Sequence, residues 1–228
     1  MKIAICYYGL SSGKNTENFD VEFTKSFATM RTIMNDYDYD IFIHSVSNNT
    51  DAQQEIITLM RPKKYKFEDK IIYNENPPSN IKKYNIAKGR WHSQKKVIEL
   101  KTSYEKENNF VYDFVFMTRF DCSYFSKFNF ENLDKNKFYA GGWLVNTQQN
   151  IDVVGIDDLW FICGSKNMDI FSMLYDNFDN YIDINNLINS TKPVSSHIMS
   201  ITHIRQSKLD LCLIKNHRTD YNITRRLS

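Results

Sequence analysis

The chain has 228 residues, of which 42% are hydrophobic and 14% aromatic, so it can bury a sizeable core and global disorder is excluded. Its 29 basic and 27 acidic residues leave a net charge of +2. No strong uniform field surrounds such a protein, which argues against a general nucleic-acid binder. We expect a single domain covering residues 1–228.

The four cysteines are far apart and form no CxxC pair of the kind found in zinc sites and thiol redox centres. Three lie in or beside expected strands, where they act as small apolar residues, so we expect a reduced, cytoplasmic compartment. The opening MKIAICYYGL has no signal-peptide pattern, and no run of about 18 apolar residues predicts a membrane span. Contact with the inner face of a membrane stays open, because basic pairs are scattered along the chain, although solvated surfaces explain those pairs equally well.

A buried strand is expected over Ile3–Tyr8, followed by Gly9 and a small polar turn typical of nucleotide-binding α/β folds. The turn is neither GxGxxG nor a P-loop, so it is weak evidence for a phosphate cradle. A second buried strand, Asp40–His44, follows an amphipathic helix. His44 ends that strand and could contact a ligand, but a structural histidine is the preferred interpretation.

The next segment predicts a helix, an edge strand and a longer helix. Thr50 to Gln53 has the spacing of a capping box, and Lys64–Glu68 is typical of an edge strand. Asn74 to Asn80 contains two prolines and predicts a loop. The longest helix is expected from Trp91 to about Glu107, and its amino-terminal end carries side chains able to bind phosphates or hydroxyls: Arg90, Trp91 and Gln94.

The stretch YDFVFMTRFDCSY contains the most informative strand. Phe114 to Met117 are continuously apolar, as in a strand buried on both faces of a parallel sheet. Arg119 and Asp121 follow at its carboxyl end, where open α/β sheets bind ligands. Two residues apart, they project to the same side and could hold a polyphosphate or a metal that carries one. The alternative is that they form structural ion pairs with other charges.

The last third of the chain alternates strands and helices. Phe138–Trp143 is an expected strand, Asn146–Asp152 a loop, and Leu159–Cys163 a buried strand that begins directly after Asp157 and Asp158. Adjacent carboxylates at the start of a buried strand must be paired or functional. We then expect a helix with apolar residues from Met168 to Phe178, a helix after Pro193 that carries His197, His203 and Arg205, and a closing strand, Leu211–Ile214.

This alternation predicts an α/β domain with a mostly parallel, mixed sheet flanked by helices. The polar residues gather where strands end, and the connection rules bring those ends to one edge of the sheet. A single cleft at that edge is therefore expected.

Several segments together resemble small GT-A-type glycosyltransferases of bacterial capsule and lipopolysaccharide biosynthesis: KIAICYYGL, YDIFIHS, HSQKKVIELKTSYEKENNFVYDFVFMTRFD, IDDLWFICGSKNMDIF and PVSSHIMSITHIRQSKLDLCLI. The resemblance covers most of the chain and implies a single GT-A-like (Rossmann-like) domain. It implies transfer of a sugar from a nucleotide-sugar donor, such as a UDP- or GDP-sugar, to a glycan or lipid-linked acceptor.

The resemblance also implies roles for individual residues. The DxD motif of GT-A enzymes binds a divalent ion, Mn²⁺ or Mg²⁺; here the motif reads R-x-D, with Asp121 as its last carboxylate and Arg119 in the first position, which leaves metal dependence open. His197 is the candidate that completes the metal shell. Asp157 or Asp158 is the expected general base. The donor-binding candidates are Tyr8, Gly9, His44, Arg90, Trp91, Gln94, Arg119 and Asp121.

Residue chemistry agrees with this expectation, since sugar transfer needs a base for the acceptor hydroxyl and a cation for the leaving diphosphate. Of the two adjacent aspartates we favour Asp158 as base, because it lies nearer the apolar strand, where burial could raise its pKa. Hydrolysis by paired carboxylates is a lower-ranked alternative. A non-catalytic nucleotide- or sugar-binding module of the same fold is the other alternative.

Overall fold

The computed structural model describes residues 1–14, 20–74, 84–142, 155–182 and 195–224. Its centre is a seven-stranded sheet in the order β3-β2-β1-β4-β7-β6-β8. The strands are β1 (Lys2–Gly9), β2 (Asp38–Val46), β3 (Lys64–Glu68), β4 (Phe114–Arg119), β6 (Lys137–Gly142), β7 (Asp157–Cys163) and β8 (Asp210–Asn216). β1 to β4 are mutually parallel, β7 is antiparallel to β4 and β6, and β8 is parallel to β6. The predicted mostly parallel, mixed sheet is confirmed.

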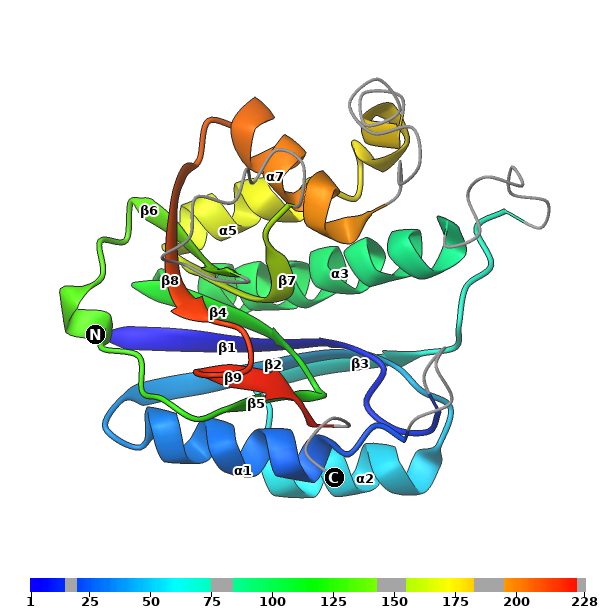
Figure 1. Ribbon diagram of the computed structural model, residues 1–228. Helices are drawn as coiled ribbons and strands as arrows, with labels where there is room; N and C mark the ends of the chain where they lie inside the picture. The colour runs from blue at the N-terminus through cyan, green and yellow to red at the C-terminus, as the bar shows by residue number, and fades with distance from the viewer. Residues whose placement is uncertain (15–19, 75–83, 143–154, 183–194, 225–228) are drawn as a thin grey trace.

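Helices cover both faces of this sheet (Figure 1). The described helices are α1 (Phe23–Met34), α2 (Thr50–Met60), α3 (Tyr84–Asn108), α5 (Ser165–Ser172) and α7 (Ser196–Gln206). In Figure 1, α1 and α2 lie below the sheet, and α3, α5 and α7 lie above it. The strands β1, β4 and β7 are buried on both faces, which is why their sequences are continuously apolar rather than alternating.

Alternate residues of these strands face two separate apolar clusters. On β1, Ile3, Ile5 and Tyr7 pack toward α1 and α2, while Ala4, Cys6 and Tyr8 pack toward α3. The cysteines Cys6, Cys122 and Cys163 are fully buried and unoxidised, as expected of small apolar residues.

Three local predictions are wrong. α3 begins at Tyr84 rather than Trp91, so Arg90, Trp91 and Gln94 lie inside the helix and not at an exposed helix start. α2 is capped by Asn49 and not by the predicted Thr50. The Asn49 side-chain oxygen accepts a hydrogen bond from the Ala52 amide, which satisfies one of the free amides of the first turn. α5 ends at Ser172, so the apolar spacing that continues to Phe178 does not belong to one helix.

Two short strands were not expected. β5 (Cys122–Tyr124) and β9 (Tyr221–Ile223) form a separate antiparallel pair, which brings the carboxyl-terminal segment against the residues that follow β4. The expected edge strand Lys64–Glu68 and the helix carrying His197 and His203 are confirmed. The predicted loop after Asn74, the loop Asn146–Asp152 and Pro193 lie outside the described residues.

A fully buried lysine links α3 to α5. The Lys101 ammonium donates to Glu105 at 2.9 Å, to Ser165 at 2.5 Å and to Asp169 at 2.8 Å. Glu105 is also buried, and its other oxygen accepts from the Tyr112 amide and the Ser165 hydroxyl. The cation is therefore the counter-charge for a buried carboxylate and anchors the helix that carries Arg90.

We predict that Lys101→Ala destabilises the protein by about 3–5 kcal/mol, because removing one partner leaves the Glu105 carboxylate buried and uncompensated. Urea unfolding followed by circular dichroism measures this. Lys96→Ala is the matched control on the same helix: Lys96 pairs only with the exposed Glu99 at 2.8 Å, and its loss should cost less than about 1 kcal/mol. Equal costs for the two variants would contradict the prediction.

Candidate functional site

The carboxyl edge of the parallel strands collects most of the predicted site residues. Tyr8 on β1 lies opposite His44 on β2 and opposite Arg119 on β4. β7 runs antiparallel to β4 with Trp160 opposite Thr118, so the first residues of β7 arrive at the edge where β4 ends. This reversal brings Asp157 and Asp158 to the same edge as Arg119.

Arg119 and Asp121 pair with each other. The guanidinium Nε donates to Asp121 Oδ1 at 2.8 Å and Nη2 donates to Oδ2 at 2.6 Å, a bidentate geometry. Burial by itself lowers the pKa of Arg119, but the Asp121 carboxylate outweighs burial and the net pKa is raised. Arg119 therefore stays charged, with its fork oriented by Asp121.

Asp158 meets a second, partly buried arginine. Its Oδ2 pairs with Arg90, which projects from the second turn of α3, and its Oδ1 lies 3.6 Å from the His197 Nδ1 atom. Its backbone oxygen accepts from the Tyr8 hydroxyl at 3.0 Å. Burial and the nearby Arg119 together lower the pKa of Arg90 to about 10, so two cations lie close together here.

Asp157 faces the other way along the strand and is held by the carboxyl-terminal segment. Its Oδ2 lies 2.5 Å from His217 Nδ1 and accepts from the Tyr221 hydroxyl at 2.8 Å. Its Oδ1 is buried and makes no hydrogen bond within the described part of the chain. The two adjacent aspartates thus have different partners, as alternation of side chains along a strand requires.

Asp157, Asp158 and His197 form a group that could hold a divalent cation. One ligand atom from each lies within 4.8 Å of the others. Burial lowers the pKa of His197, and its Nδ1 lies 2.9 Å from the Ile156 carbonyl oxygen. Two carboxylates and one imidazole, with an unbonded Asp157 oxygen among them, fit Mn²⁺ or Mg²⁺. Asp121, predicted as a metal ligand, lies outside this group.

The remaining predicted residues lie around this edge in different environments. Gly9 adopts a φ of 99°, which favours glycine at the turn after β1, and its amide donates to Ser93 Oγ at 2.8 Å. Gln94 is buried beside the Tyr8 hydroxyl. Trp91 is buried in the core, with its ring 6.1 Å from that of Phe171, so it packs rather than lining an open surface.

His44 is fully buried, and both of its ring nitrogens have partners. Nδ1 lies 2.8 Å from Ser93 Oγ and Nε2 lies 3.0 Å from Glu68 Oε2. Burial lowers the pKa of His44 to about 4, against the opposing effect of Glu68. His44 is therefore neutral near pH 7, and its contact with a donor stays a prediction.

Sequence reasoning missed His217 and Tyr221, which hold Asp157. Both follow the last expected strand, in a stretch without apolar periodicity. His217 comes directly after β8, where its amide donates to the Gly142 carbonyl of β6, and Tyr221 lies on β9, which pairs with β5. Tyr221 also packs tightly: a Cβ on Gly141 would lie 1.9 Å from its hydroxyl. No sequence pattern signals this contact.

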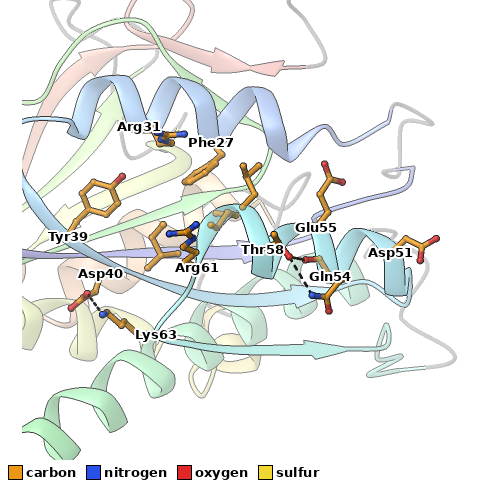
Figure 2. Close-up of a pocket in the computed structure, with 13 residues that line it drawn as sticks. Phe27, Arg31, Tyr39, Asp40, Asp51, Gln54, Glu55, Thr58, Arg61 and Lys63 are labelled. Carbon is orange, nitrogen blue, oxygen red and sulfur yellow. Dashed lines mark hydrogen bonds and ion pairs between the residues drawn. The ribbon is translucent and has the colours of Figure 1, made fainter.

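A separate hollow lies between α1, α2 and the start of β2 (Figure 2). It encloses about 950 Å³ and is lined by apolar residues mixed with charged ones of both signs. None of the predicted site residues lines it. Its Asp40 and Lys63 pair with each other at 3.4 Å, as Figure 2 shows.

No protein-family model matches the chain. No curated protein sequence matches it either. One solved structure that it is similar to is that of a "putative nucleotide-diphospho-sugar transferase" from Desulfovibrio desulfuricans G20, with 9% sequence identity, 94% of this chain and 80% of that chain covered, and a TM-score of 0.49. A likeness of this size does not identify a function. Within the described residues, no helix is both long and apolar enough to cross a membrane.

The backbone that carries the two aspartates is joined to α7 at Gly155. Ile156 donates its amide to the His197 carbonyl at 3.3 Å, and Gly155 has a φ of 74°. A Cβ there would lie 2.3 Å from the His197 carbonyl carbon. Only glycine fits this position, so the spacing of His197 from Asp157 and Asp158 depends on it.

We predict that Gly155→Ala lowers the free energy of unfolding by at least about 1 kcal/mol, since a side chain at positive φ is strained and this one also meets backbone. Gly89→Ala is the matched control, because its Cβ would meet only the Tyr73 ring at an ordinary 3.7 Å and alanine favours the interior of α3 by about 0.5–1 kcal/mol. Chemical denaturation of both variants measures the difference. A Gly155→Ala protein as stable as wild type would contradict the argument.

Proposed function

We propose that the protein is a glycosyltransferase that takes a nucleotide-sugar donor and transfers the sugar to a glycan or lipid-linked acceptor. The observation that carries the proposal is the pair of partly buried guanidiniums, Arg90 and Arg119, beside a carboxylate–imidazole group at the carboxyl edge of the sheet. Guanidinium forks and a divalent cation are the groups that proteins use to bind a diphosphate. The resemblance of the sequence to capsule and lipopolysaccharide glycosyltransferases points the same way.

In this proposal Arg119 binds the donor diphosphate while Asp121 fixes the orientation of its fork. Tyr8 stays a neutral phenol, because burial raises its pKa even though Arg90 and Arg119 oppose the rise. A divalent cation, held by His197 with Asp157 or Asp158, would neutralise negative charge on the leaving diphosphate. Asp121 as an additional ligand remains part of the hypothesis.

The general base is proposed to be Asp158, with Asp157 as the close alternative. Asp158 pairs with Arg90, on the side of the sheet covered by α3, whereas Asp157 is bound by His217 and Tyr221. The contacts with His217 and Tyr221 suit a positioning role for Asp157. Arg90 can then contact both Asp158 and the nucleotide sugar, since a guanidinium has several N–H groups.

The proposal includes a cytoplasmic location, with contact to the inner face of the membrane where a lipid-linked acceptor would lie. The rival hypothesis is a module of the same fold that binds a nucleotide or a sugar without turnover. Donor binding supports both hypotheses, whereas release of free nucleotide in the presence of an acceptor supports only the enzyme.

The proposal is tested with a panel of UDP- and GDP-sugars measured by thermal shift, with and without Mn²⁺. A true donor raises the melting temperature in proportion to its affinity and concentration. Arg119→Lys should lose at least about tenfold in donor affinity, because an ammonium cannot hold Asp121 through two hydrogen bonds, as the guanidinium does, and still present further N–H groups to the diphosphate. If no nucleotide sugar stabilises the wild type, the proposal is wrong; if Arg119→Lys binds the donor as wild type does, the arginine is structural.

Asp158→Asn tests the base. We expect it to keep donor affinity within about threefold and to lower the rate of transfer by about 10²–10⁴, the usual contribution of a general base. Isothermal titration measures donor binding, and single-turnover nucleotide release measures the chemical step. Loss of donor binding would reassign Asp158 to the metal or diphosphate site. Wild-type rates in both Asp158→Asn and Asp157→Asn would exclude either aspartate as base.

A further inference from the structure

We infer that the chain carries a second metal site, for a transition-metal ion of the Zn²⁺ type, formed by His44, Glu68 and His92. One ligand atom from each of the three lies within 4.8 Å of the others. The group shares no residue with Asp157, Asp158 and His197, and of its three members only His44 is among the donor-binding candidates.

The fold directs all three side chains into one space under α3. His44 lies opposite Lys66 in the parallel pairing of β2 and β3, and Glu68 lies two residues further along β3. Residues two apart on a strand share a face, so His44 and Glu68 project to the same side. His92 reaches them from α3, with its ring 5.7 Å from that of His44.

His92 is the residue that the rest of the structure leaves unexplained. It is 8% exposed, and neither of its ring nitrogens makes a hydrogen bond in the described part of the chain. Its neighbours are rings: His44, Tyr73 at 5.9 Å and Tyr175 at 5.3 Å. The His92 nitrogens are not among the fully buried side-chain atoms that lack a partner, so solvent reaches them and an imidazole lone pair is available to a metal ion.

The contacts of His44 are those that orient a metal ligand. Its Nδ1 lies 2.8 Å from Ser93 Oγ, and the Ser93 hydroxyl in turn reaches the His44 carbonyl oxygen at 3.2 Å. Nε2 lies 3.0 Å from Glu68 Oε2, so without a metal a proton is shared between these two atoms, and a bound metal ion would take the place of that proton. Such outer contacts fix the tautomer and the ring orientation of ligating histidines.

Glu68 keeps one oxygen available for the site. The exposed Lys66 pairs with Oε1 from outside, while Oε2 faces His44. Ligands at zinc distances are about 3.4 Å apart in a tetrahedron, so the three atoms need to shift by only about 1 Å to bind one ion. Three ligands leave a fourth position for water or a small ligand.

The donor set selects the class of metal. Two imidazoles and one carboxylate suit Zn²⁺ and its transition-metal neighbours, whereas Mg²⁺ and Ca²⁺ prefer oxygen ligands. The group of two aspartates and one histidine is richer in oxygen. The two sites are therefore expected to differ in metal preference.

The test is titration of the chelator-treated full chain with Zn²⁺ by isothermal calorimetry, with thermal melting as a second readout. We expect one Zn²⁺ per chain to bind at this group, and His92→Ala and Glu68→Gln to weaken that binding at least about tenfold and to abolish the zinc-dependent rise in melting temperature. The Glu68 side chain is partly exposed and glutamine has nearly the same shape, so we expect Glu68→Gln to fold. This variant carries the test if His92→Ala does not fold.

Two variants serve as controls. His203→Ala removes a buried histidine that hydrogen-bonds Tyr181 at 2.8 Å and is not a member of the His44–Glu68–His92 group. This variant should bind Zn²⁺ as the wild type does. Asp158→Asn should also keep the ion. Wild-type protein that takes up no Zn²⁺, His92→Ala and Glu68→Gln variants that bind it unchanged, or loss of binding in Asp158→Asn alone would each overturn the inference.

Discussion

The candidate site depends on the antiparallel pairing of β7 with β4. In a purely parallel sheet the start of a strand lies at the opposite edge from the ends of its neighbours. Because β7 is reversed, its first residues, Asp157 and Asp158, arrive beside the last residues of β4. The carboxylates that begin β7 and the arginine that ends β4 thus share one edge, although 37 residues lie between Arg119 and Asp157 in the sequence.

That arrangement concentrates charge in a poorly solvated region. Among the described residues, Asp158 pairs with Arg90 and Asp121 with Arg119, while Asp157 contacts His217 and Tyr221. Burial lowers the pKa of His197, which favours its neutral form. Buried negative charge is costly unless a cation compensates it. Under the proposed function, the carboxylates would attract a divalent ion, and the ion and the arginines would attract the phosphates.

The sequence was sufficient for the strands of the parallel half, because continuous apolar runs such as Phe114 to Met117 have few interpretations once they alternate with helices. It also predicted that polar residues at strand ends would gather. It could not supply the partners of Asp157, since Tyr221 reaches it through the short β5–β9 pairing and His217 from the end of β8. The start of α3 was missed because Tyr84 to Arg90 has no sharp apolar stripe, and tertiary packing rather than local propensity sets that boundary.

α3 connects the two candidate metal groups. Arg90 reaches Asp158 at one group, and two residues later His92 reaches His44 and Glu68 at the other, while Ser93 accepts from the Gly9 amide between them. Residues two apart on a helix differ in direction by about 200°, so Arg90 and His92 point to nearly opposite sides and one short stretch of α3 can reach both groups. A displacement of this helix would therefore move both groups at once. The fully buried Lys101, further along the same helix, opposes a displacement of α3 relative to α5, because that movement would break the contacts of its ammonium with Ser165 and Asp169 on α5. Its other partner, Glu105, lies on α3 itself and would move with it. The precision of the edge is thus set in part by an ion pair that touches neither group.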